Sequence, residues 1–212
     1  WHIWVTDRPE EHIYPDDAGV MMDRNLGATS IVIGEKETSG LLYQWGRKDP
    51  FLGYFSSTST IEWADNYTYS NSTTGTIKYT IMNPTEFIGG NTSGSGVYQD
   101  WHYKTNKNRW QSSKTMYDPC PSGWRVPDQI NWNGDSISDK TDDGGYSFSI
   151  LTPSSTWYPA SGFSQSSRGA SYYGKYGAYW TISSYFRFAY YVSFLSKPLE
   201  TYSNIQYNIY YV

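Results

Sequence analysis

A nucleophilic thiol is the first chemistry that the residue types allow, because the chain has one cysteine, Cys120, and three histidines. A cysteine nucleophile reacts as the thiolate and needs a histidine base close by. His2, His12 and His102 stand in no recognisable local signature with Cys120, which lies between two prolines. We therefore expect Cys120 to be a small, largely buried apolar residue. A single cysteine also excludes an internal disulfide.

Paired carboxylates are the second possible chemistry, because two of them flanking a glycosidic bond can act as acid and base. Asp16, Asp17, Asp139, Asp142 and Asp143 are the candidates. Nothing in their spacing brings them together, and the Asp-Asp-Gly-Gly run at 142–145 has the composition of a turn. A glycan-processing enzyme stays an alternative, and it requires two carboxylates within about 10 Å of each other in a cleft.

Oxygen ligands for calcium occur at 131–135 and 139–143, without the spacing of an EF-hand loop. We expect no cofactor, with a structural calcium ion as the alternative.

Length and charge exclude several classes of protein. The 212 residues carry a net charge of −4, and their 16 basic residues are scattered, so nucleic acid is not an expected partner. No apolar run approaches the roughly 20 residues that cross a bilayer, and direct membrane insertion is not expected. The chain starts at Trp1 without a signal peptide. We expect one domain over 1–212, the C-terminal part of a longer precursor that is anchored at the cell surface through upstream residues.

Short elements and long loops are predicted from the pattern, because no window longer than about ten residues keeps a helical period. Short helices are expected at Thr60–Tyr67 and Pro127–Trp132. The runs that favour strands are His2–Thr6, Gly19–Asp23, Tyr146–Leu151, Tyr179–Ser183, Ala189–Leu195 and Tyr207–Val212.

Specific sequence motifs, rather than composition, point to a family. They are WHIWVTD at Trp1–Asp7, MDRNLGA at Met22–Ala28, GLLYQWGRKDPF at Gly40–Phe51, YDPCPSGWRVP at Tyr117–Pro127, and WYPASGF at Trp157–Phe163 with GAYWTISS at Gly177–Ser184. In this order, over nearly the whole chain, they resemble the C-terminal C-type-lectin-like domain of fimbrillin-like surface adhesins of the Bacteroidetes. That domain is related to the Fibrobacter succinogenes major paralogous domain.

The resemblance implies an α+β, C-type-lectin-like fold, shared with formylglycine-generating enzymes, with short helices, small twisted antiparallel sheets and long loops. Enzymes of this fold use cysteine pairs, which this chain lacks. The calcium-binding motifs of many C-type lectins, such as Glu-Pro-Asn, are absent as well.

The same motifs also suggest structural roles for their arginine and tryptophan residues. Arg24 can bind a carboxylate bidentately, and Arg47 can stack on an aromatic face. Trp45, Trp124, Trp157 and Trp180 are expected in the core, which few aliphatic residues are left to build.

The last part of the chain is rich in tyrosine: residues 172–212 hold 11 of its 22. Alternation in Ala189–Phe194 places Tyr190, Val192 and Phe194 on one face of a strand, and Ala189, Tyr191 and Ser193 on the other. The first set resembles core, so we expect the second to face outward. Tyr, Ser and Asn make adaptable binding surfaces. The candidate ligand-binding residues are Tyr185, Phe186, Arg187, Tyr191, Ser193, Tyr202, Asn204 and Tyr207.

The function predicted is therefore non-enzymatic recognition or adhesion at a cell surface, through a glycan or protein receptor that binds the Tyr-rich C-terminal surface. One alternative is a structural or assembly domain of a fimbria-like or phage surface fibre, whose partners are neighbouring fimbrial subunits. The other is the glycan-processing enzyme considered above.

Overall fold

A computed structural model describes residues 5–14, 19–53, 67–90, 100–104, 106–132, 137–141, 145–148, 156–163, 172–185, 188–195 and 206–211. For residues 137–141, 145–148 and 206–211, and for Thr156, Tyr185, Phe188 and Leu195, only the backbone is described. Small sheets, one six-residue α-helix and short 3-10 turns form the regular structure within these ranges. This mixture confirms the predicted α+β class at the level of its elements.

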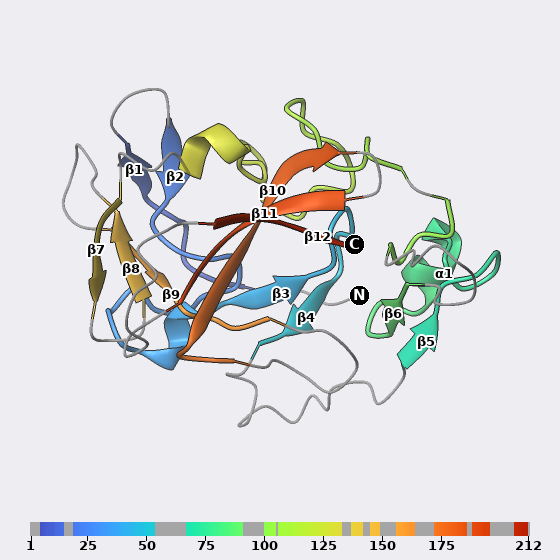
Figure 1. Ribbon diagram of the computed structural model, residues 1–212, viewed down its shortest axis with the longest axis horizontal. Coiled ribbons are helices and arrows are strands. Elements are labelled where there is room, and N and C mark those ends of the chain that lie inside the picture. The colour runs from blue at the N-terminus through green and yellow to red at the C-terminus, as the bar shows by residue number, and fades with distance from the viewer. Residues whose placement is uncertain are drawn as a thin grey trace.

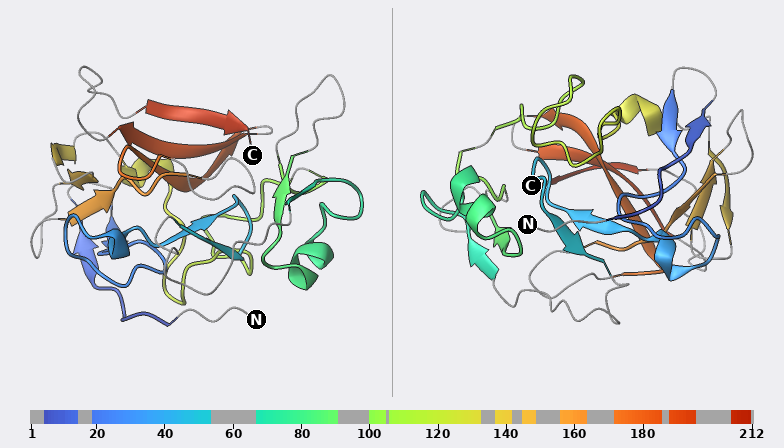
Figure 2. Two further views of the ribbon diagram at one scale, coloured as in Figure 1. Left: turned by 90° about the horizontal axis from the view of Figure 1, so that it is seen from below. Right: turned by 180° about the vertical axis from the view of Figure 1, so that it is seen from behind.

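The longest strands among the described residues form an antiparallel sheet in the order β10 (Tyr176–Tyr185), β11 (Phe188–Leu195) and β12 (Gln206–Tyr211). Trp180 pairs with Tyr191 in its register, and an irregularity follows between Trp180 and Ser184. Aromatic and β-branched residues dominate these strands, as the pleated surface of a sheet favours. Figure 2 shows the three strands as one layer on one side of the molecule.

The remaining described strands form smaller sheets. The two-stranded antiparallel pairs are β1 (Glu11–Ile13) with β2 (Val20–Met22), and β3 (Leu41–Tyr43) with β4 (Pro50–Leu52). A three-stranded antiparallel sheet holds β7 (Ile137–Thr141), β8 (Gly145–Phe148) and β9 (Thr156–Pro159). The parallel pair is β5 (Tyr67–Tyr69) with β6 (Phe87–Gly89), and α1 (Ile77–Met82) lies between them in the chain. In Figure 1 this β5–α1–β6 unit forms one end of the molecule.

Within the described ranges, helical structure is limited to short pieces, as the pattern predicted. Thr76 caps α1, because its hydroxyl oxygen accepts a hydrogen bond from the backbone N–H of Tyr79 at 3.2 Å. The helix expected at 127–132 is a 3-10 helix, η4 (Gln129–Trp132), and a second 3-10 turn, η2, covers Lys36–Thr38. The helix expected at 60–67 lies outside the described residues except for Tyr67, which begins β5.

Five of the six predicted strands overlap observed ones, namely β2, β8, β10, β11 and β12. The sixth, at 2–6, lies mostly outside the described residues, and Val5 and Thr6 are not in a strand. None of the helices among the residues described has the length and apolar composition to cross a bilayer.

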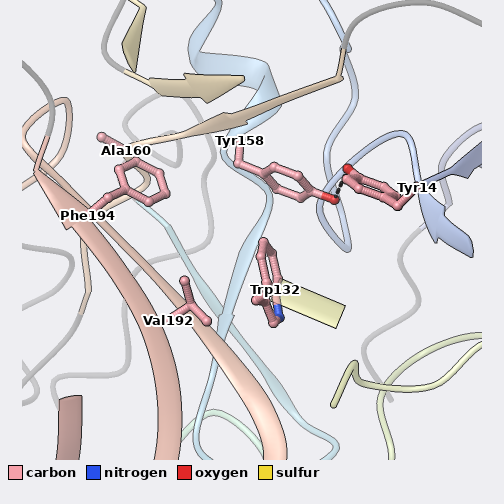
Figure 3. Packing of buried hydrophobic residues seen from close by; sticks show 6 residues of the cluster. All are labelled: Tyr14, Trp132, Tyr158, Ala160, Val192 and Phe194. Atoms are coloured by element: carbon pink, nitrogen blue, oxygen red, sulfur yellow. Dashed lines mark hydrogen bonds between the residues drawn. The ribbon is translucent and has the colours of Figure 1, made fainter. Parts of the chain in front are cut away.

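Two clusters of buried, largely aromatic residues form the core in the part of the chain that the structure describes. The first contains Tyr14, Trp132, Tyr158, Ala160, Val192 and Phe194, and Figure 3 shows the hydroxyls of Tyr14 and Tyr158 hydrogen-bonded to each other, 2.8 Å apart. The second contains Trp45, Trp110, Val126, Ile182 and Ala189.

The tryptophans expected in the core only partly match these clusters. Trp45 is buried as predicted, whereas Trp124, Trp157 and Trp180 are half-buried. The other deeply buried tryptophans among the described residues are Trp101, Trp110 and Trp132, which the sequence motifs did not single out.

Candidate functional site

A cavity of about 1040 Å³ lies among β2, β3, the loop at 119–127, the residues after β9, and strands β10 and β11. Its volume matches the upper end of the range for small-ligand pockets. Aromatic side chains make up much of its lining, including Tyr172, Tyr176 and Tyr191 from the Tyr-rich segment. A concave, aromatic-lined space of this size is the natural candidate for a binding site.

Five cavity-lining rings touch one another in a row, which we call the aromatic wall: Tyr172, Phe163, Tyr176, Tyr191 and Trp180. The rings of Tyr172 and Phe163 are stacked, with centroids 5.2 Å apart and an interplanar angle of 12°. Phe163 meets Tyr176 edge-on at 5.2 Å, and Tyr191 meets Trp180 edge-on at 5.6 Å. The hydroxyls of Tyr176 and Tyr191 lie 3.4 Å apart and join the two halves. The wall thus offers ring faces and phenol hydroxyls together.

Glycines let two distant segments meet at this wall. Gly162 has a φ of 71°, and its N–H donates to the carbonyl of Tyr176 at 2.7 Å, which holds Phe163 beside the start of β10. Gly174, with the same φ of 71°, donates to the carbonyl of Ala160 at 2.8 Å. Positive φ angles favour glycine, which has no Cβ to clash. These two glycines therefore set the spacing between the segment after β9 and the turn before β10.

Tyr172 has an unusual backbone for its residue type. Its φ is 62°, the only positive φ at a non-glycine residue in the described part of the chain. Its carbonyl accepts hydrogen bonds from the N–H groups of Lys175 and Tyr176, both at 3.0 Å. The residue is 58% exposed and also lines the cavity, so it stands where the cavity opens to solvent. A large side chain kept in a strained conformation at an opening is typical of a functional position.

Tryptophan indoles tie the cavity walls to the scaffold. The Nε1 atoms of Trp45, Trp101 and Trp180 donate to the carbonyls of Thr181, Trp45 and Tyr43, at 2.9, 2.8 and 2.8 Å. Buried indole N–H groups need such partners. Because their N–H groups already bond to the backbone, these tryptophans can offer a ligand their ring surface but no polar contact through Nε1.

Buried arginines reinforce the same scaffold. Arg47 donates to the Asp49 carboxylate at 2.8 Å, and its guanidinium lies 5.0 Å from the centre of the Phe51 ring, as the expected aromatic contact requires. Burial lowers the pKa of Arg47, while Asp49 opposes that shift. Arg109 donates to Asp100 at 2.9 Å and lies 4.7 Å from the Trp101 ring centre. Both cations are therefore held inside the structure.

One buried carboxylate shapes the loop that carries Cys120 and Arg125. Asp118 is fully buried, and it accepts hydrogen bonds from the backbone N–H groups of Cys120 at 2.9 Å and Val126 at 3.0 Å. Lys114 Nζ also donates to it, at 2.7 Å. Because both ends of the loop bind the same carboxylate, Cys120 and Arg125 are brought to the cavity, which both residues line.

The thiol of Cys120 is poorly suited to nucleophilic chemistry. Burial raises its pKa well above the ordinary value, Asp118 adds to this, and the charges of Lys114 and Arg125 only partly oppose it. A reactive cysteine has a lowered pKa instead. The side chain is half-buried and packs against the second core cluster, close to the expected structural role.

Asn25, from the MDRNLGA motif, is the centre of a polar cluster that lines the cavity. Its Nδ2 donates to the carbonyl of Ser39 at 3.1 Å and lies 3.3 Å from the hydroxyl of Tyr179. Burial raises the pKa of Tyr179 to about 12, so this phenol is protonated at neutral pH. The neighbouring Arg24 binds Asp23 bidentately at 2.9 and 2.8 Å, which confirms the predicted charge-assisted pair.

The predicted outward face of β11 is wrong. Tyr191 is 8% exposed and Ser193 is 3% exposed. Strand β11 lies between β10 and β12, and both of its faces are covered: Val192 and Phe194 join the first cluster, whereas Ala189 joins the second. Tyr191 nevertheless lines the cavity, so it remains a candidate that is reached from inside rather than from the outer surface.

The other predicted ligand residues are not placed by side chain. The backbones of Tyr185 and Tyr207 lie in β10 and β12. The described residues do not include Phe186, Arg187, Tyr202 and Asn204. Phe163, Tyr172 and Tyr176, which the sequence interpretation did not select as ligand-binding residues, contribute to the aromatic wall. The glycines at 162, 174 and 177 that bracket them were the available signal.

The described part of the chain holds few of the residues predicted for metal binding or carboxylate catalysis. No group of three or more His, Cys, Asp or Glu side chains that could hold a metal occurs there. Asp16, Asp17, Asp142 and Asp143 lie outside it, and only the backbone is described for Asp139. Asn131, one candidate calcium ligand, accepts a hydrogen bond from the backbone N–H of Asp128 through its side-chain oxygen, at 2.6 Å.

Comparison with family models, curated proteins and solved structures found no match to this chain.

Proposed function

We propose that this chain is a non-enzymatic recognition module of C-type-lectin-like fold that acts at a cell surface and binds a glycan through the aromatic wall. The observation that carries the proposal is the stacked pair of Tyr172 and Phe163 at the opening of the cavity, with Tyr172 58% exposed and in a strained backbone. The resemblance of the sequence motifs to lectin-like adhesin domains, together with the small sheets and short helices, supports the proposed C-type-lectin-like fold.

A glycan suits this geometry for two reasons. Sugar rings have apolar C–H faces that pack on flat aromatic rings, and their hydroxyls hydrogen-bond to groups such as the phenols of Tyr176 and Tyr191. The site is a cavity rather than a flat patch, and concave sites favour small or narrow ligands. A protein partner that inserts a single loop into the cavity is the other reading of the Tyr-rich segment.

The direct experiment is a glycan microarray probed with the wild-type chain and two variants. Tyr172→Gly removes the exposed ring without straining the backbone. Tyr103→Ala is the matched control, because Tyr103 is 52% exposed but does not line the cavity. We expect at least a tenfold loss of signal for Tyr172→Gly and unchanged signal for Tyr103→Ala, as for loss of a central aromatic contact. Full binding by Tyr172→Gly would place the site elsewhere, and a folded wild-type chain that binds no glycan would contradict the function.

A further inference from the structure

The cavity that carries the proposed function holds charged residues of one sign among the residues described. Arg24 and Arg125 line it, and no Asp or Glu appears among the described lining residues. The chain as a whole carries a net charge of −4, so this local balance differs from that of the molecule. A cavity with basic and aromatic lining favours a ligand that combines negative charge with an apolar face.

The two arginines differ in how far their charge is already neutralised. Arg24 binds both oxygens of the Asp23 carboxylate, at 2.9 and 2.8 Å. Arg125 is half-buried, and its Nη1 donates to the backbone carbonyl of Val126 at 2.9 Å. It takes part in none of the ion pairs found in the described ranges. A guanidinium has five N–H donors, so Arg125 keeps donors for a ligand.

Arg125 and the rings of the aromatic wall line the same cavity. Val126, its neighbour, belongs to the second core cluster, against which Trp180 packs. Trp180 is the last ring of the wall, whereas Tyr172 stands at the opening. Because Arg125 and the wall line one cavity, a ligand bound there can contact both.

We propose that the ligand is an acidic saccharide, whose carboxylate or sulfate is bound by Arg125 while its sugar ring stacks on the aromatic wall. This inference rests on the proposed function and names the ligand class. Arginine suits both anions, because its planar fork matches their oxygens. The net negative charge of the chain gives no long-range attraction for such a ligand, so selectivity for the acid comes from the local contact.

The test is a microarray of matched pairs: uronic-acid oligosaccharides and their methyl esters, sialylated and desialylated glycans, and sulfated and unsulfated galactosides. We expect the wild-type chain to bind the acidic member about 10- to 100-fold more tightly, the range for a charged hydrogen bond. Arg125→Gln should remove this preference and leave the binding of neutral glycans unchanged. Arg125→Lys should retain part of it, because the charge stays. Arg8→Gln, at an exposed arginine outside the cavity lining, is the control and should behave as wild type.

The outcomes separate the two proposals. Equal binding of the acidic and neutral members would overturn the acidic ligand. A preference that survives in Arg125→Gln, with an intact fold by circular dichroism, would overturn the binding of the anion by Arg125. Either result would leave glycan recognition in place. Absence of all glycan binding by the folded wild-type chain would overturn both. Comparing the carboxylated with the sulfated saccharides on the array shows which of the two anions Arg125 binds.

Discussion

Replacing Tyr172 by glycine and by alanine tests the backbone geometry that aims its ring at the cavity. At φ 62° an L-residue bears a cost of about 1–2 kcal/mol, which glycine avoids. Both variants lose the stacking on Phe163, about 0.5–1.5 kcal/mol, so this loss cancels between them. Glycine loses more backbone entropy on folding, about 0.5–1 kcal/mol. We therefore expect Tyr172→Gly to be more stable than Tyr172→Ala by about 0.5–1 kcal/mol.

The assay is urea unfolding followed by tryptophan fluorescence, with free energies of unfolding from linear extrapolation. Lys175 supplies the matched control pair, because it is exposed in the same turn and its φ is not positive. There, alanine should be more stable than glycine, as at ordinary positions. A Tyr172→Ala variant that equals or exceeds Tyr172→Gly in stability would refute the strained conformation, and with it the argument that the fold holds this ring at the opening for a purpose.

Three further predictions concern His102 and the loop that Asp118 organises. Burial lowers the pKa of His102 below its ordinary value, so the unfolded chain binds the proton first as the pH falls. The free energy of unfolding should then decrease between about pH 7 and pH 5, and a His102→Gln variant that keeps the wild-type slope would contradict this. Because burial raises the pKa of Cys120, the native thiol should react slowly with a disulfide reagent at pH 7 and rapidly in urea; fast labelling of the folded chain would argue against the described environment. Asp118→Ala leaves the N–H groups of Cys120 and Val126 without their acceptor and should cost about 3 kcal/mol or more in thermal or urea unfolding, whereas a cost below about 1 kcal/mol would show that the loop does not depend on it.

Local features of the chain were predictable where the partners are close in sequence. Asp23 and Arg24 are neighbours in the MDRNLGA motif, and a bidentate bond from Arg24 to a carboxylate was expected from that motif alone. Strands β10 and β11 follow from runs of aromatic and β-branched residues. Arg47 could be assigned an aromatic partner because aromatic residues surround it in the sequence.

Features that depend on what covers a surface were not predictable in the same way. Alternation along β11 separates two faces but does not say whether the second face meets solvent or a second cluster, and here Ala189 meets Trp45 and its neighbours. The aromatic wall joins Phe163 to Tyr172 and Tyr176 through backbone bonds of Gly162 and Gly174, which no periodicity reveals. The left-handed backbone of Tyr172 has no signature in the sequence, because a tyrosine there is an exception to the preference for glycine.

The most direct test of glycan recognition by the aromatic wall is an NMR titration of the aromatic ring signals with the saccharide that gives the strongest microarray signal. The account predicts saturable shifts in the rings of Phe163, Tyr172 and Tyr176, with the ring of the exposed Tyr103 unaffected. Shifts confined to rings outside the cavity, with those three unchanged at saturation, would contradict it.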